Sequence, residues 1–90
     1  MSTMFPGLDE GEIRLAIIEF LVKKGRWGAH YFPLGTLVNW FSKRIQKNGK
    51  VLRRCIKSLI KEGIILSHKK GNTISLNPAK IEEIRSLIKK

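Results

Sequence analysis

The segment Asn48 to Ile65, NGKVLRRCIKSLIKEGII, most restricts the possible folds because its basic and apolar residues separate onto two sides of one helix. At about 100° per residue, the basic residues fall within about a third of the helical circle. They are Lys50, Arg53, Arg54, Lys57 and Lys61. The opposite side carries Leu52, Cys55, Ile56, Leu59 and Ile60. We therefore expect a helix from Asn48, a good capping residue, to Glu62, ended by Gly63, with one side in the core and the other exposed.

Charge is unevenly distributed along the chain. Eighteen Lys and Arg against seven Asp and Glu give a net charge of +11, and Glu62 is the only acid between Lys23 and Lys80. An ordinary surface helix alternates lysines with glutamates at i,i+4. Charges of one sign repel one another, so a strongly basic region usually binds a polyanion. This polyanion can be nucleic acid, an anionic membrane surface or an acidic protein. The alternative is a thermophile-like excess of solvated lysines without a partner.

The start of the chain predicts an arm and a helix. Residues 1–8 contain Pro and Gly and show no period, so a flexible N-terminal arm is expected there. Asp9 and Glu12 are spaced as a capping box, and apolar residues then recur on one helical face. This helix is expected to end near Lys24, with Gly25 in the capping position beyond it.

A short strand and a second helix are expected next. The aromatic-rich stretch predicts a strand from Ala29 to Phe32, stopped by Pro33. The segment LGTLVNWFSKRI then has apolar residues at helical spacing, which predicts a helix from Leu34 to Lys43. Only a brief connection separates this helix from the basic one.

Two β-branched runs follow the basic helix. They are Ile64 to His68 and Thr73 to Leu76, and they flank the turn sequence KKGN. This pattern predicts a β-hairpin whose tip projects Lys69 and Lys70.

The C-terminal residues 77–90 predict an amphipathic helix. Asn77 is a good cap, and Pro78 occupies the favoured first helical position. This helix either packs on the first helix of the same chain or pairs with its copy in a homodimer.

The element order, together with SLIKEGII leading into LSHKKGNTISL, resembles the winged helix-turn-helix family of DNA-binding domains. The resemblance covers about Glu10 to Leu76. It implies an α+β fold with a three-helix helix-turn-helix core, a short strand plus a β-hairpin wing, and a C-terminal helix. The expected division is an arm over 1–8, a winged-helix domain over 9–76 and a C-terminal helix over 77–90.

The resemblance also implies which residues contact DNA. Leu34 to Lys43 would be the supporting helix, Asn48 to Glu62 the recognition helix in a major groove, and the hairpin the wing on the backbone. The residues expected at the DNA are Lys43, Arg44, Lys47, Asn48, Lys50, Arg53, Arg54, Lys57, Lys61, Lys69 and Lys70. Arginine pairs bidentately with guanine, whereas lysine supplies charge to phosphates. Since few Ser, Thr, Gln or Asn lie on this face, weak sequence preference is expected as readily as strict specificity.

Other chemistry finds little support in the sequence. Cys55 lies on the apolar side of its helix, where a buried thiol is expected, and a single cysteine cannot form an internal disulfide. His30 and His68 are far apart, with no Cys, Asp or Glu cluster beside either, so no metal site is expected. Neither a nucleophile–His–acid set nor a phosphate-binding loop is recognisable, so we expect no enzyme and no cofactor.

Double-stranded DNA is therefore the expected partner, bound by a small transcriptional regulator or a chromosome-associated protein. The single cysteine and the lack of a signal peptide favour a cytoplasmic, nucleoid-associated location, and no apolar run approaches the roughly 18 residues of a membrane span. Two alternatives are a winged-helix module that grips an acidic protein partner and an RNA-binding module. The RNA alternative depends on an exposed aromatic side chain, and Trp27 is the residue expected to be exposed.

Overall fold

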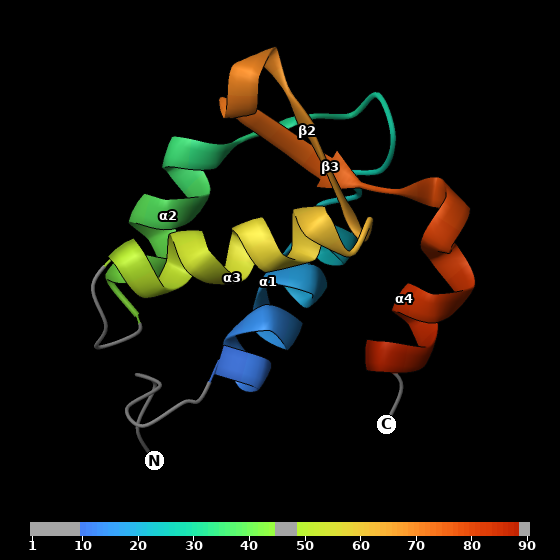
Figure 1. Cartoon of the computed structure of the whole chain (residues 1–90), viewed down its shortest axis with the longest axis horizontal. Helices are drawn as coiled ribbons and strands as arrows, with labels where there is room; N and C mark the ends of the chain where they lie inside the picture. Colours follow the sequence, from blue (N-terminus) through green and yellow to red (C-terminus); the bar gives the residue numbers. More distant parts are fainter. Residues whose placement is uncertain (1–9, 45–48, 89–90) are drawn as a thin grey trace.

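The computed structural model of the chain describes residues 10–44 and 49–88. Within them lie four α-helices and one sheet, so the chain has an α+β fold (Figure 1). The order is α1 (Glu10–Lys23), β1 (Phe32–Pro33), α2 (Leu34–Ser42), α3 (Gly49–Lys61), β2 (Ile65–His68), the single turn η1 (Lys69–Gly71), β3 (Thr73–Leu76), the short 3-10 turn η2 (Pro78–Lys80) and α4 (Ile81–Ile88). The predictions for residues 1–8, Asp9, Lys47 and Asn48 lie outside the described ranges.

Helix α3 ends where its sequence predicts. Gly63 has a φ of +82°, and its N–H donates to the Ile60 carbonyl, while the Ile64 N–H donates to the Leu59 carbonyl, both at 3.0 Å. These two hydrogen bonds form a Schellman cap, which favours glycine because the left-handed conformation crowds a Cβ. Gly25 ends α1 with the same pair of hydrogen bonds. The cap at Gly63 turns the chain directly from α3 into β2.

The three strands form an antiparallel sheet in the order β1-β3-β2. The predicted strand from Ala29 to Phe32 is wrong in its bounds, because β1 consists of Phe32 and Pro33 alone. The strand does end at Pro33, but Pro33 itself belongs to β1, because a missing N–H on an edge strand costs no ladder hydrogen bond. The residues before it turn instead, and Trp27 forms an isolated parallel bridge with Leu76.

The hairpin follows the prediction closely. Four pairs in register join β2 to β3, from Ile65 opposite Leu76 to His68 opposite Thr73. The loop that they close contains KKGN, and Figure 1 shows it at the top of the molecule, above α3. Lys69 and Lys70, at the tip, are both exposed.

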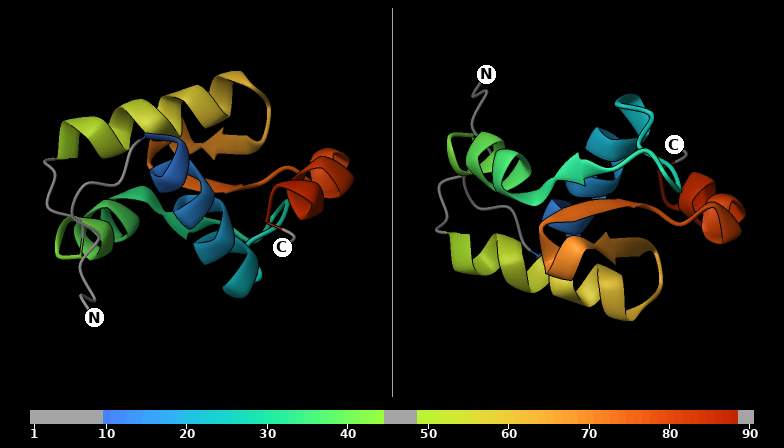
Figure 2. Two further views of the ribbon diagram at one scale, coloured as in Figure 1. Left: turned by 90° about the horizontal axis from the view of Figure 1, so that it is seen from below. Right: turned by 90° about the horizontal axis from the view of Figure 1, so that it is seen from above.

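The core lies where α1, α2, α3 and the sheet meet. Its fully buried side chains include Ile13, Ile17, Leu21, Leu37, Leu52, Leu59, Ile65, Ile74 and Leu76. Cys55 is 1% exposed, which confirms the prediction of a buried thiol. Helix α4 packs on α1 through the fully buried Ile84, and Figure 2 shows the two helices side by side. The α-helix begins only at Ile81, because the Asn77 side chain accepts from the Ala79 N–H and caps a 3-10 turn first.

No helix in the described part of the chain is long and apolar enough to cross a membrane. The helices and the antiparallel sheet are compatible with a winged-helix layout.

Candidate nucleic-acid interface

Helix α3 has the two faces that its sequence predicts. Leu52 and Leu59 are fully buried, whereas the basic residues on the other side are exposed. These exposed residues are Lys50, Arg53, Arg54, Lys57 and Lys61. Figure 1 shows α3 across the front of the molecule, with the hairpin above it. At 1.5 Å per residue, its 13 residues form a basic ridge about 20 Å long.

Among the described residues, Arg54 differs from Arg53, Lys57 and Lys61 because it is paired with a carboxylate of α1. Its Nη2 lies 2.5 Å and its Nε 3.0 Å from Glu10 Oε2. These hydrogen bonds raise the pKa of the Arg54 guanidinium above its ordinary value. Arg53, Lys57 and Lys61 take part in no ion pair within the described residues. A phosphate would therefore compete with Glu10 for Arg54 but not for these three cations.

The acid at the end of α3 is also held by α1. Arg14 donates from Nη1 and Nη2 to the two carboxylate oxygens of Glu62, at 2.6 Å each. Arg14 Nη1 also donates to Ser58 Oγ at 2.7 Å. The hydrogen bond from Arg14 lowers the pKa of Glu62 below its ordinary value. The negative charge of Glu62 is thus neutralised at the α1 side of α3.

Sequence reasoning missed both cross-helix pairs. A signal for them is present, because Glu10 and Arg14 are four residues apart on α1, while Arg54 lies on α3 and Glu62 directly follows it. These pairs can be recognised only once the two helices are known to pack together.

The end of α2 supplies two further candidate residues. Lys43 is exposed and directly follows the helix. Arg44 is half-buried, its guanidinium lies 3.8 Å from the centre of the Trp40 ring, and its Nη1 donates to the Trp40 carbonyl at 2.9 Å. Arg44 is therefore fixed in position on Trp40, whereas the Lys43 side chain has no such contact with another described residue. The remaining candidates of this connection, Lys47 and Asn48, lie outside the described residues.

The tip of the hairpin holds two exposed lysines in an unfavourable backbone conformation. Lys69 has a φ of +51° and Lys70 a φ of +58°. The left-handed region costs a non-glycine residue about 1–2 kcal/mol. Backbone strain of this kind is concentrated at functional sites. The turn thus places both exposed lysines at the tip of the hairpin at a cost in backbone energy.

A stacked pair of rings lies at the loop end of β2. The rings of Tyr31 and His68 lie 3.9 Å apart between centroids. Ser75 donates its hydroxyl proton to the Gly28 carbonyl at 2.6 Å, so the His68 Nε2, 3.2 Å from Ser75 Oγ, is the donor in that contact. Among the described residues, no group of three or more His, Cys, Asp or Glu side chains could hold a metal ion.

The expectation that Trp27 is the exposed aromatic residue is wrong. Trp27 is half-buried and packs against the core, because its bridge to Leu76 draws this segment onto the sheet. Tyr31 and Trp40 are more exposed, at 37% and 36%. The RNA alternative therefore cannot depend on Trp27.

Comparisons of the chain with protein-family models, with curated proteins and with solved structures find no match. What the chain binds must therefore be inferred from its own residues.

Proposed function

We propose that this chain is a winged-helix module that binds double-stranded DNA, with α3 as the recognition helix in the major groove and the β2–β3 hairpin as the wing. The order of helices and strands and the β1-β3-β2 sheet support this assignment. The observation that carries it is the exposed basic face of α3, on which Arg53, Lys57 and Lys61 have no carboxylate partner in the described chain.

The dimensions and chemistry of α3 suit a major groove. A ridge of about 20 Å spans about six base pairs at 3.4 Å each, and the groove is wide enough to admit a helix. Arg53 can pair bidentately with guanine, while Lys57 and Lys61 supply charge to phosphates. The wing lysines, Lys69 and Lys70, would neutralise the adjacent backbone without reading sequence.

The proposed role is that of a small transcriptional regulator or chromosome-associated protein. The exposed face of α3 is nearly all Arg and Lys, and phosphate neutralisation is independent of sequence. We therefore propose a modest sequence preference. Glu82 and Glu83 lie on α4, on a different element from the basic ridge.

Fluorescence anisotropy with a labelled random-sequence duplex, titrated at several salt concentrations, tests this function. The variant Arg53→Ala/Lys57→Ala removes two charges from α3. The control Arg85→Ala/Lys23→Ala removes two exposed charges from α4 and α1. We expect the α3 variant to lose about tenfold or more in affinity, and its salt slope to fall by about one to two, because each lost phosphate contact removes about 0.9.

The control separates groove binding from general attraction. Its affinity for duplex should lie within about threefold of that of the unaltered chain, because the control changes the electrostatic potential only at a distance from α3. Equal losses in the two variants would contradict a role for α3. Stronger competition by single-stranded RNA than by duplex would favour the RNA alternative, and a lack of duplex binding at low salt would direct the search to an acidic protein.

A further inference from the structure

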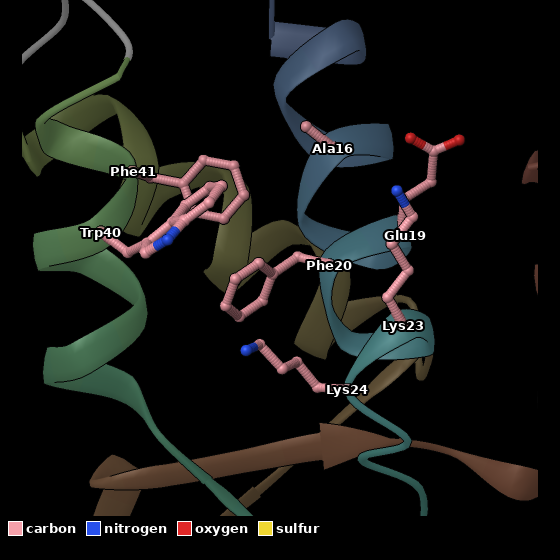
Figure 3. A pocket seen from close by; sticks show the side chains of 7 residues that line it. All are labelled: Ala16, Glu19, Phe20, Lys23, Lys24, Trp40 and Phe41. Carbon is pink, nitrogen blue, oxygen red and sulfur yellow. The ribbon is translucent and has the colours of Figure 1, made fainter.

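A groove between α1 and α2 combines aromatic walls with charged edges. It has a volume of about 480 Å³, which suits a small organic molecule. Figure 3 shows the side chains around it. Those used below are Glu19, Phe20, Lys23, Lys24, Trp40 and Phe41.

Three rings form the apolar part of the groove. The centroid of Phe20 lies 4.8 Å from that of Trp40 and 5.5 Å from that of Phe41, and the rings are tilted or edge-on to one another. Phe41 is 2% exposed and belongs to the core. Phe20 is half-buried, and Trp40 is 36% exposed although the Arg44 guanidinium lies against its ring. An indole and a phenyl ring thus keep apolar surface uncovered inside a concavity.

The charged edges of the groove favour an anion. The Lys24 Nζ lies 5.5 Å from the centre of the Phe20 ring, and Figure 3 shows it pointing into the space between α1 and α2. The Lys23 side chain runs along α1 toward Glu19. Glu19, the single carboxylate among the described residues that line the groove, is therefore beside Lys23, and Lys24 is the lining cation that lies over the Phe20 ring. The net charge of +11 adds to the positive potential there.

We infer that this groove binds a small planar aromatic anion, one or two fused rings bearing a carboxylate. The rings would pack on Trp40 and Phe20, and the carboxylate would pair with Lys24. A carboxylate held by an ammonium group beside apolar surface is a charge-assisted contact stronger than one in open water.

The arrangement suits one ring system rather than a strand of nucleotides. Proteins that bind single strands align several aromatic side chains along a basic track. Here Tyr31, the other exposed aromatic ring among the described residues, is stacked on His68 and does not line the groove. The groove also shares no residue with the candidate DNA interface, so binding here does not depend on the proposed DNA-binding function.

NMR titration of the ¹⁵N-labelled chain, without DNA, tests the inference. The three ligands are indole-3-acetate, its neutral analogue indole-3-acetamide, and the cation tryptamine. The amide signals that shift should be those of residues 16–24 and 40–41. We expect the anion to bind about fivefold to tenfold more tightly than the amide, as one charge-assisted contact predicts, and tryptamine to bind most weakly.

Matched variants assign the charge preference to one lysine. Lys24→Gln should reduce the affinity for indole-3-acetate by about fivefold to tenfold, to about that for indole-3-acetamide. The affinity for indole-3-acetamide itself should not change. Lys57→Gln removes the same charge from α3 and should leave the anion-to-amide ratio unchanged. Trp40→Phe keeps an aromatic ring in the wall of the groove. It should weaken the binding of all three ligands, while the NMR spectrum remains that of a folded chain.

Three results would overturn the inference. The first is equal binding of the three ligands, or no binding at millimolar concentration. The second is an equal effect of Lys24→Gln and Lys57→Gln, which would indicate attraction by net charge. The third is that a short oligothymidine shifts these amide signals while indole-3-acetate does not, which would make the groove a platform for a nucleobase.

Discussion

Arg14 and Glu62 join the middle of α1 to the end of α3 through two parallel hydrogen bonds of 2.6 Å. Because a bidentate arginine–carboxylate pair has a fixed geometry, it restrains the position of one helix relative to the other. Since α3 carries the candidate interface, this pair helps to orient the basic ridge on the body of the molecule.

The pair should make stability depend on pH. The pKa of Glu62 is below its ordinary value of 4.5 in the folded chain, so the stabilisation is present above pH 4.5 and is lost as the pH falls through the folded pKa. Glu62→Gln should lower the free energy of unfolding at pH 7 by about 1 kcal/mol or less, because the side chain is 45% exposed and solvent screens the pair. Urea unfolding at pH 7 and in acid measures this, and a pH-independent difference would contradict it.

Glu10 should weaken DNA binding by occupying Arg54. Glu10→Gln removes the carboxylate from the guanidinium and leaves Arg54, which is 62% exposed, free for a phosphate. We expect affinity for duplex to rise about twofold to fivefold at low salt, with a steeper salt slope. The control Glu82→Gln removes the same charge from α4 and should have a smaller effect. Equal effects of the two variants would mean that Arg54 does not reach the DNA.

Sequence patterns predict those parts of this fold that depend on local chemistry. Helix α3 and the hairpin are found because the apolar period, the glycine after the helix and the KKGN turn all act within a few residues. For the same reason, the exposed side of α3 was predicted correctly.

Features that depend on distant partners were missed or misplaced. The Trp27 side chain looks solvent-exposed in a glycine-rich loop, but its bridge to Leu76, 49 residues away in the chain (76 − 27), places it against the core. The Arg14–Glu62 pair likewise joins residues 48 positions apart. The first contact cannot be derived until the sheet is known, and the second cannot be derived until the packing of α1 on α3 is known.

The Cys55 thiol should be unreactive in the folded chain. It is 1% exposed, and burial, assisted by the nearby Glu10, raises its pKa above the ordinary value. Because the thiolate is the reactive form, alkylation by iodoacetamide at pH 7.5 should be about 100-fold or more slower than in guanidinium chloride. Mass spectrometry over time measures the modification. Rapid alkylation without denaturant would show that α1 and α3 separate readily.

Relieving the backbone strain at the hairpin tip should stabilise the chain but weaken its binding to duplex DNA, because the same change removes a positive charge. Lys70→Gly relieves a φ of +58° and should raise the free energy of unfolding by about 0.5 kcal/mol, less than the full strain because glycine gains entropy when unfolded. The same change should weaken duplex binding and reduce the salt slope by about one. Gly71→Ala is the matched control: its Cβ would meet only Ser67 Oγ, at 3.8 Å, but its φ of +88° is unfavourable, so stability should fall while the charge stays. If Lys70→Gly stabilises the chain and leaves duplex affinity unchanged, the strain at the tip serves something other than DNA contact.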